Sequence, residues 1–452
     1  MSYVGWEHVT LYVTVGYIMG SGYTIGVIGL WHLGEVYAAS LAEIGHTVIG
    51  LSDDATLVGN FQKNIPPLAE PRLAELLAAN QESGGLSFST DFSKIKDCNV
   101  VWFTQDVPTD ENDTVDVSGV LDAARDAARY FADGVTVAVS SQLPVGTSAK
   151  IIEVVRSARP ELSFGYFYSP ENLRLGDAVK CFMEQERVVV GAATPGALKA
   201  AQDIFSPLKT EIISMSPASA EMAKHAMNAW LATSISFTND LADVCEKTGA
   251  DIEDVIRALK SEPRVGSKAY LFAGLGFAGW SIARDLKALM AVAGEKHIEL
   301  PIIAGAYAKN RARTGVVLAR LQERYGDIKG KTFAIFGVTY KVGTPTLRHS
   351  QSLQIEEQLR AAGATVRLYD PLAKAEEVAA ATSAPFFNDP YEAAQGADGV
   401  LVLVPDRALR EFDFKKIASS MKTPFLFDAQ NILIPKEGDI RAAGIEYSSI
   451  GR

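Results

Sequence analysis

A strand–helix–strand pattern over residues 24–54 restricts the fold of this chain more than any other segment. Residues 24–29 read as a buried strand that enters a turn, and helical periodicity follows over 33–43. Gly45 closes that helix, and the apolar run at 47–51 is typical of a second strand covered on both faces. The pattern therefore predicts a parallel, doubly wound α/β sheet.

The turn after the first strand carries two of the three glycines of a dinucleotide-binding fingerprint. Gly29 holds the first position and Gly34 the third, but Trp31 stands in the middle. A glycine there lets the cofactor pyrophosphate touch backbone at the helix N-terminus. The indole of Trp31 either lies beside the phosphate site and lines it, or fills the site. Gly29, Trp31 and Gly34 are therefore candidate cofactor-binding residues.

The end of the second strand should carry an acid that binds the ribose hydroxyls. Ser52 occupies the aligned position, and Asp53 and Asp54 follow it. We expect Asp53 to take this role. Two adjacent acids would repel a 2′-phosphate, which favours NAD over NADP as the cofactor. The alternative is a doubly wound domain that no longer holds a dinucleotide.

Later apolar runs predict that a second doubly wound unit follows the first. Strands are expected at 100–104, 135–140, 332–336, 366–370, 400–404 and 424–427. A long helix over 217–245 lies between the two groups of strands. The predicted fold class is α/β, with two Rossmann-like doubly wound domains joined by a long central helix.

The start of the long helix has the expected capping residues. Ser216 is a plausible N-cap, and Pro217 takes the first helical position, where its missing N–H costs nothing. Glu221 suits the positive end of the helix dipole. Lys224 and Asn228 are four residues apart and therefore share one face.

Composition excludes several classes of function. The 452 residues are 48% hydrophobic and 21% charged, with a net charge of −11, so we expect a globular protein without a nucleic-acid partner. The three cysteines are far apart, which argues for a reducing, cytoplasmic location and against a disulfide framework. The six histidines form no metal-binding pattern, so no metal site is expected.

The first 23 residues stand apart from this organisation. Apolar and polar residues alternate over 9–17 with the period of a strand, and the segment has no Lys or Arg and no helix-length apolar run. It is therefore expected to be neither a signal peptide nor a membrane span. Two readings stay open: an accessory extension, with Met19 as an alternative start, or an extra edge strand that pairs with another element.

A glycine-rich stretch from Gly274 to Asp285 provides the main functional signal. It reads Gly-Leu-Gly-Phe-Ala-Gly-Trp-Ser-Ile-Ala-Arg-Asp, and Arg284 and Asp285 fall where a helix is expected to start. The stretch resembles the active-site loop of the UDP-glucose/GDP-mannose dehydrogenase family, Gly-Phe-Gly-Gly-Ser-Cys-x-x-Lys-Asp. Ser281 stands at the position of the family's cysteine, and Arg284 at that of its lysine.

Other segments extend this resemblance over about residues 24–452. Residues 141–147 are similar to the family's Ser-Thr-Val-Pro-x-Gly-Thr turn, with Gln142 for the threonine. Residues 169–176 resemble Asn-Pro-Glu-Phe-Leu-Arg-Glu-Gly, with Leu175 for the second glutamate. Residues 340–350 resemble Phe-Lys-x-x-Thr-Asp-Asp-x-Arg-x-Ser, with both acids replaced, and 428–431 resemble Asp-x-Arg-Asn, with Gln430 for the arginine.

The resemblance implies a domain organisation and a set of site residues. The domains are an extension over 1–23, an NAD-binding domain over 24–210, a central helical and dimerisation region with the active-site loop over 211–315, and a nucleotide-sugar-binding domain over 316–452. The implied catalytic residues are Lys224, Asn228, Ser281, Asp285 and Glu171. The implied cofactor residues are Gly29, Trp31, Gly34, Asp53 and Arg348, and the implied substrate residues are Arg264, Gly276, Phe277, Gly279 and Lys341. The alternative for Glu171, Lys224 and Arg264 is that each is a solvated surface charge without a functional role.

The chemistry of the resembled family depends on a thiol. Its members transfer hydride twice from a sugar primary alcohol to NAD. A cysteine attacks the intermediate aldehyde, removal of the second hydride leaves a thioester, and water then cleaves it. A serine hydroxyl needs an adjacent base to act as such a nucleophile, and no Ser-His pair is evident around Ser281. Cys245 lies 21 residues beyond Lys224, about 31 Å along a helix at 1.5 Å per residue. Cys181 fits no family position, although the sequence does not exclude it.

Three hypotheses follow. The first is an NAD-dependent, dimeric nucleotide-sugar dehydrogenase that does not complete the thioester-based oxidation. The second is a catalytically silent protein of the same fold that binds a nucleotide sugar. The third is a conventional dehydrogenase that uses Ser281 directly and forms an oxygen ester.

Overall fold

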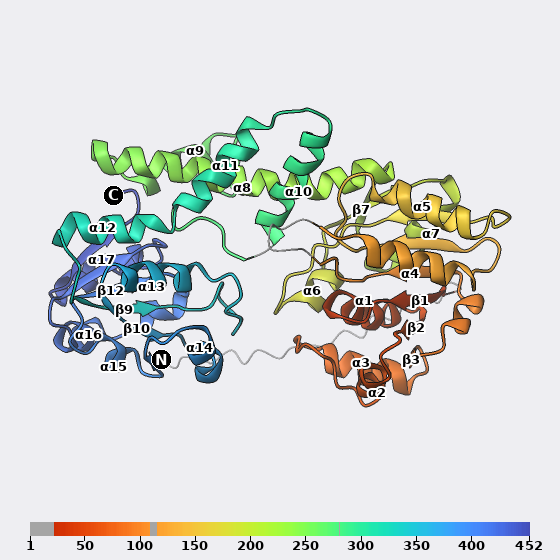
Figure 1. The fold of residues 1–452 in the computed structure, drawn as a ribbon, viewed down its shortest axis with the longest axis horizontal. Helices are drawn as coiled ribbons and strands as arrows, with labels where there is room; N and C mark the ends of the chain where they lie inside the picture. Colours follow the sequence, from red (N-terminus) through yellow and green to blue (C-terminus); the bar gives the residue numbers. More distant parts are fainter. Residues whose placement is uncertain (1–21, 109–114, 280) are drawn as a thin grey trace, which may run out of the picture. The chain divides into compact units, whose positions relative to one another are not determined.

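The computed structural model describes residues 22–108, 115–279 and 281–452, in two compact units (Figure 1). Unit 1 holds the described residues of 1–108 and 116–221, and unit 2 holds those of 109–115 and 222–452. The expectations for residues 1–21 lie outside the described part of the chain.

Unit 1 is built on an eight-stranded sheet in the order β3-β2-β1-β4-β5-β6-β7-β8. All neighbouring strands are parallel except β6 and β7. The strands are β1 (Thr24–Ile28), β2 (Thr47–Leu51), β3 (Leu86–Ser89), β4 (Val100–Phe103), β5 (Thr136–Val139), β6 (Gly165–Tyr168), β7 (Arg187–Ala192) and β8 (Glu211–Met215).

Seven helices belong to the described part of unit 1. They are α1 (His32–Glu43), α2 (Ala55–Phe61), α3 (Leu73–Glu82), α4 (Ser118–Ala128), α5 (Thr147–Ala158), α6 (Ala178–Met183) and α7 (Pro195–Phe205). Central strands such as β4 are buried along their whole length because helices cover both faces, which explains their continuous apolar sequence. Trp102 of β4 packs edge-on against Tyr37, Phe167 and Phe205 in this core.

Unit 2 repeats the same strand order in a six-stranded parallel sheet, β11-β10-β9-β12-β13-β14. The strands are β9 (Thr332–Phe336), β10 (Thr365–Tyr369), β11 (Phe386–Phe387), β12 (Gly399–Val402), β13 (Phe425–Asp428) and β14 (Glu446–Ser449). Its helices after α8 are α9 (Ile252–Ser261), α10 (Ser281–Glu295), α11 (Pro301–Ala312), α12 (Gly315–Tyr325), α13 (Gln351–Ala361), α14 (Ala375–Ala381), α15 (Pro390–Ala394), α16 (Phe414–Ser420) and α17 (Glu437–Ala442). The predicted fold class is confirmed: the order 3-2-1-4-5-6 of a doubly wound fold occurs in both sheets.

The long helix α8 (Pro217–Thr248) joins the two units. Ser216 caps it as expected, because its Oγ accepts a hydrogen bond from the Ser219 N–H at 3.2 Å. Glu221 lies beyond the first turn of α8, so the predicted interaction with the dipole of this helix is not what the structure shows. Its buried carboxylate accepts hydrogen bonds from Gly146 N and Ser148 N, both at 2.6 Å, and so binds the N-terminus of α5 within unit 1.

Candidate functional site

The turn between β1 and α1 shows why glycine is required at both ends of the fingerprint. Gly29 has φ +101°, and a Cβ there would lie 2.6 Å from the backbone N of Gln105. A Cβ on Gly34 would lie 2.0 Å from the carbonyl oxygen of Gly29. Glycine at these two positions therefore lets α1 pack directly on the end of β1.

A hollow of about 520 Å³ lies where a dinucleotide is expected, at the carboxyl ends of β1 and β2. Gly29, Ser52 and Asp53 line it, together with Phe92, Gln105 and Tyr130, which the sequence reasoning missed. Asp54 is used elsewhere, because its carboxylate caps α2 through Thr56 N and Leu57 N. Of the two adjacent acids, Asp53 is therefore the one that faces this hollow. Its carboxylate and the hydroxyl of Ser52 suit the ribose hydroxyls in the adenosine half of NAD.

Trp31 occupies the N-cap position of α1 in an extended conformation. Its side chain is 46% exposed, and it is not among the described residues that line the 520 Å³ hollow. Of the two possibilities for the indole, this position favours the one in which it stands beside the cofactor site.

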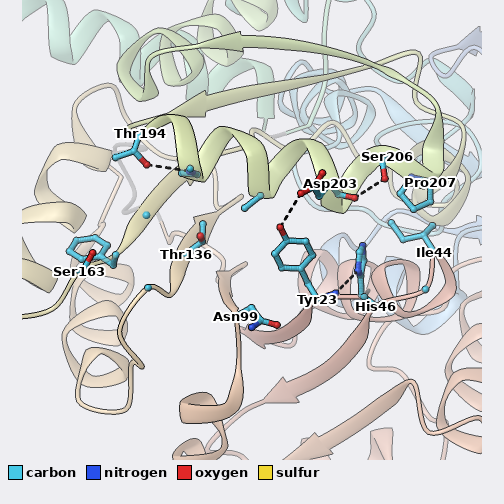
Figure 2. Close-up of a pocket in the computed structure, with 18 residues that line it drawn as sticks. Tyr23, Ile44, His46, Asn99, Thr136, Ser163, Thr194, Asp203, Ser206 and Pro207 are labelled. Atoms are coloured by element: carbon cyan, nitrogen blue, oxygen red, sulfur yellow. Dashed lines mark hydrogen bonds between the residues drawn. The ribbon is translucent and has the colours of Figure 1, made fainter. Parts of the chain in front are cut away.

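A larger hollow, of about 1190 Å³, opens at the amino ends of the strands of unit 1 (Figure 2). Its polar groups are engaged with one another: Tyr23 Oη donates to Asp203, and His46 Nδ1 accepts from Tyr23 N (Figure 2). His46 Nε2 also lies 2.9 Å from the Ile204 carbonyl, and burial lowers the pKa of this imidazole. This hollow lies at the opposite ends of the strands from the fingerprint glycines, so we do not assign the cofactor to it.

Gln142 and Glu171 lie at the same edge of the sheet as the fingerprint glycines. They follow β5 and β6 by three residues each, and these strands pair in register at Val139 and Tyr168. Both side chains are half-buried, and Glu171 Oε2 accepts a hydrogen bond from Leu173 N at 2.8 Å. The carboxylate of Glu171 therefore belongs to a structured turn.

Unit 2 brings two of the predicted catalytic residues into contact, Asn228 from α8 and Asp285 from α10. Lys224 lies one turn before Asn228 on α8 and is 8% exposed. Asp285 is 1% exposed, and its Oδ2 accepts a hydrogen bond from Asn228 Nδ2. His225, which the sequence reasoning missed, places Nδ1 3.3 Å from Asp285 Oδ1. A buried carboxylate needs such partners, because burial without them costs several kcal/mol.

The signal for His225 was available in the sequence. It follows Lys224 directly and precedes Asn228 by three residues, a spacing that places residues on neighbouring faces of a helix. The contact with Asp285 depends on how α10 packs against α8, which the sequence did not specify.

Ser281 is the first residue of α10, which corrects the expectation that the helix starts at Arg284. The helix begins three residues earlier, so Ser281 and Asp285 are separated by one turn on the same helix. Ser281 is exposed, whereas Asp285 is buried. The hydroxyl is therefore presented at the helix start, and the carboxylate lies inside unit 2.

None of the three cysteines has the features of a reactive thiol. Cys245 is buried on α8 in the apolar cluster that covers the sheet of unit 2. Burial raises the pKa of the Cys98 thiol to about 11 and also raises the pKa of the Cys181 and Cys245 thiols. A raised pKa lowers the thiolate fraction at neutral pH, so these thiols are poor nucleophiles.

The predicted substrate residues fall on three loops of unit 2. Gly276 and Gly279 have φ +88° and +82°, and Phe277 between them is buried. Arg264 is exposed, with Nε 2.8 Å from Glu262 Oε1. Lys341 and the exposed Arg348 lie on the loop that follows β9, at the carboxyl edge of the second sheet. Asp370 anchors this loop by accepting hydrogen bonds from Val338 N and Thr339 N.

Among the described residues, no cluster of ligating side chains is suited to hold a metal ion. The helices in the described ranges also include none that is both long and apolar enough to cross a lipid bilayer.

Comparison with known families gives three matches in chain order. Residues 23–209 match the NAD binding domain of the UDP-glucose/GDP-mannose dehydrogenase family, residues 218–312 its central domain, and residues 334–435 its UDP binding domain.

Individual relatives match over nearly the whole chain. A UDP-glucose 6-dehydrogenase of Bacillus subtilis is 32% identical, covering 95% of this chain and 97% of the relative. One from Pseudomonas aeruginosa is also 32% identical, over 94% and 97%. Among solved structures, a UDP-glucose dehydrogenase from Pyrobaculum islandicum superposes with a TM-score of 0.83 at 25% identity, covering 96% of this chain and 99% of that one.

Proposed function

The chain belongs to the UDP-glucose/GDP-mannose dehydrogenase family, and from this we propose that it oxidises a UDP- or GDP-sugar with NAD but does not complete the four-electron oxidation through a thioester. The proposal rests on two observations: a buried polar cluster around Asp285, and an exposed hydroxyl on Ser281. Asn228 and Asp285 are bonded inside unit 2, while Ser281 stands one turn before Asp285 where the thiol is expected.

NAD is the cofactor of this family's N-terminal domain, and when bound it supplies the acceptor for the hydride that leaves the sugar carbon. In this chain, Gly29 and Gly34 let α1 pack closely on the end of β1, where the cofactor would bind, and Asp53 is the acid proposed to bind ribose hydroxyls. We assign Arg348 to the cofactor as well, on the family resemblance alone.

The polar cluster of unit 2 supplies groups for proton transfer. Asp285 is the proposed base, since Asn228 fixes one of its oxygens and His225 approaches the other. Lys224, which is 8% exposed, is the proposed stabiliser of the oxyanion that develops as the alcohol loses its proton. Glu171 is proposed as a further acid or base, and Arg264, Gly276, Phe277, Gly279 and Lys341 as substrate-binding residues.

The next step is where this chain departs from a complete dehydrogenase. Oxidation of the aldehyde to an ester requires a nucleophile that first adds to the carbonyl carbon and then a second hydride transfer to NAD. A serine hydroxyl remains protonated near neutral pH unless a base adjoins it. Gln142 and Leu175 replace a threonine and a glutamate of the family pattern. We propose that these replacements also leave the chain less able to hold the water that would hydrolyse the ester. We therefore propose that oxidation stops at the carbonyl stage.

A second candidate function is binding of a nucleotide sugar without turnover. The observation in its favour is Trp31, whose indole replaces the glycine at the middle of the fingerprint. In that case the indole would keep the pyrophosphate away from the N-terminus of α1, and NAD would not bind although the 520 Å³ hollow is open.

Calorimetric titration with NAD, followed by incubation with NAD and UDP-glucose or GDP-mannose, separates these functions. The proposal predicts NAD binding and formation of NADH, with a product whose mass is two hydrogens below that of the sugar nucleotide. Binding of the sugar nucleotide without binding of NAD would contradict the proposal and support the silent alternative. An oxygen ester detected by intact mass would instead support direct use of Ser281.

We also propose that the protein forms a homodimer through α8. Four large apolar side chains are exposed along this helix: Met222 at 40%, Trp230 at 68%, Phe237 at 48% and Val244 at 58%. Their spacings of eight, seven and seven residues place them in one stripe, which is the pattern of a helix that packs against another helix. By the family resemblance, Arg264 would then reach the substrate of the partner subunit.

The three free thiols support a cytoplasmic location, which we propose for this protein.

A further inference from the structure

The side-chain amide of Asn310, near the end of α11, forms two hydrogen bonds with the backbone of Phe277. Asn310 Oδ1 accepts a hydrogen bond from Phe277 N at 2.7 Å, and Asn310 Nδ2 donates to Phe277 O at 3.0 Å. One carboxamide thus bonds both polar backbone groups of a single loop residue. The Phe277 side chain is buried among residues of α8 and α10, including Ile235 and Leu286.

The neighbouring glycine fits this arrangement. Gly276 has φ +88°, and a Cβ built on it would lie 2.1 Å from Asn310 Oδ1. The space that a side chain would fill at position 276 is therefore occupied by the carboxamide. The backbone conformation and the missing Cβ are two separate reasons for glycine at this position.

Other polar groups hold the earlier part of the same loop. Gly274 N donates to Asn239 Oδ1 at 3.0 Å, and Gly274 O accepts from Arg313 Nε at 2.9 Å. Gln351 Nε2 donates to Leu275 O at 2.9 Å. Arg313 is 1% exposed and pairs with Asp243, so its removal would disturb the interior of unit 2.

We propose that Asn310 is a positioning residue that fixes the substrate loop in the conformation needed for the reaction. By substrate loop we mean the described residues of 274–281. Phe277 is held by Asn310 on one side of Ser281, and Asp285 is held by Asn228 on the other. The short segment between these two anchors carries the exposed hydroxyl of Ser281 and the glycine at 279. A fixed loop presents the sugar carbon in one orientation, which is a large part of rate enhancement in such sites. In naming this segment the substrate loop, the inference rests on the proposed function.

Hydrogen-exchange mass spectrometry of the full chain tests the positioning directly. In Asn310→Ala, the Phe277 amide loses its acceptor, and we expect it to exchange about tenfold faster or more. Asn310→Asp keeps an acceptor for Phe277 N but loses the donor to Phe277 O, so an intermediate rate is expected. Arg311→Ala, which removes an exposed side chain one position away, should leave exchange of the loop unchanged.

Function gives a second readout. We expect Asn310→Ala to raise the KM for UDP-glucose about tenfold or lower kcat by a similar factor, while the Kd for NAD changes less than twofold. NAD affinity serves as the internal control because the proposed site for the adenosine half of NAD lies in unit 1. A general loss of structure would weaken both ligands together and lower the melting temperature.

A double-mutant cycle keeps the inference testable even if one variant is poorly active. Gly276→Ala places a methyl group against Asn310 Oδ1, so its effect on loop exchange should be smaller in the Asn310→Ala background. Unchanged loop exchange in a folded Asn310→Ala protein, or strict additivity in the cycle, would overturn the inference. If the wild-type protein binds neither UDP-glucose nor GDP-mannose, the proposed function fails, and the exchange results still decide the role of Asn310.

Discussion

At the residue scale, the proposed chemistry depends on two side chains four residues apart on α10. Asp285 is buried and bonded to Asn228, whereas Ser281 is exposed at the helix start. In the proposed function, Asp285 takes part in proton transfer, and Ser281 lacks the sulfur atom that thioester formation requires. The proposal therefore assigns the difference between partial and complete oxidation to the oxygen atom at position 281.

Ser281→Cys is expected to restore trapping of the aldehyde. A thiol at this exposed helix start ionises more readily than a hydroxyl, and the positive end of the helix dipole favours the thiolate. We expect at least about tenfold more uronate than in the wild type, measured by product mass. Ser281→Ala is the matched control and should behave as the wild type. A large loss of activity in Ser281→Ala would show instead that the hydroxyl takes part in the reaction.

A second residue-scale feature is Glu35, a carboxyl group that is fully buried on α1. Burial raises the pKa of Glu35 from 4.5 to about 8; a hydrogen bond with the backbone of Leu68 partly opposes this rise, and the nearby Glu70 adds to it. The folded protein therefore keeps a proton on Glu35 at pH values where the unfolded chain has released it.

This proton makes the stability of unit 1 depend on pH. The stabilisation is complete below pH 4.5, falls as pH rises toward 8 by up to about 1.4 kcal/mol per pH unit, and levels off above 8. Glu35→Gln stays neutral, so its thermal stability should exceed that of the wild type by a margin that grows between pH 5 and 8. The exposed Glu75→Gln serves as control. A constant difference across this pH range would show that Glu35 is ionised when folded.

At the scale of elements, the site depends on how closely α1 approaches β1. Gly34→Ala would place a Cβ 2.0 Å from Gly29 O, so α1 has to move away from the strand. We expect a loss of about 1–3 kcal/mol in unfolding free energy and a fall of at least about tenfold in NAD affinity, measured by denaturation and calorimetry.

Gly59→Ala provides the matched control for this substitution. Gly59 lies inside α2, and a Cβ there meets no atom within 4 Å outside its own helix. We expect it to stabilise the protein by about 0.5–1 kcal/mol and to leave NAD binding unchanged. Equal effects of the two substitutions would contradict the role assigned to Gly34.

At the scale of the whole molecule, the apolar stripe on α8 determines the proposed assembly. Trp230→Glu combined with Phe237→Glu puts two charges into the proposed interface, so we expect a monomer of 48.6 kDa in place of a dimer. Light scattering during size-exclusion chromatography measures this. The control is Ile65→Glu, a charge at an exposed apolar residue of unit 1. A wild-type protein with the monomer mass at micromolar concentration would rule out the proposed dimer.

The sequence was sufficient for the architecture because each sheet leaves a local signature. Buried parallel strands read as continuous apolar runs, as at 24–28 and 332–336, and the Ser216–Pro217 pair marked the start of α8. The site was harder to predict because its contacts join distant segments. Asn310 and Phe277 are 33 residues apart, and His225 and Asp285 are 60 apart, so neither pair follows from local periodicity. The start of α10 was misplaced because Ser281 was treated as part of the loop.

The ratio of NADH formed to sugar nucleotide consumed tests whether oxidation stops after one hydride. Purified protein is incubated with NAD and UDP-glucose, NADH is followed by absorbance, and the products are identified by mass. With Ser281 in place of the thiol, we predict one NADH per sugar and an aldehyde or its hydrate as product. Two NADH per sugar, with rapid formation of a uronate, would contradict the proposal that this chain lacks the nucleophile for complete oxidation.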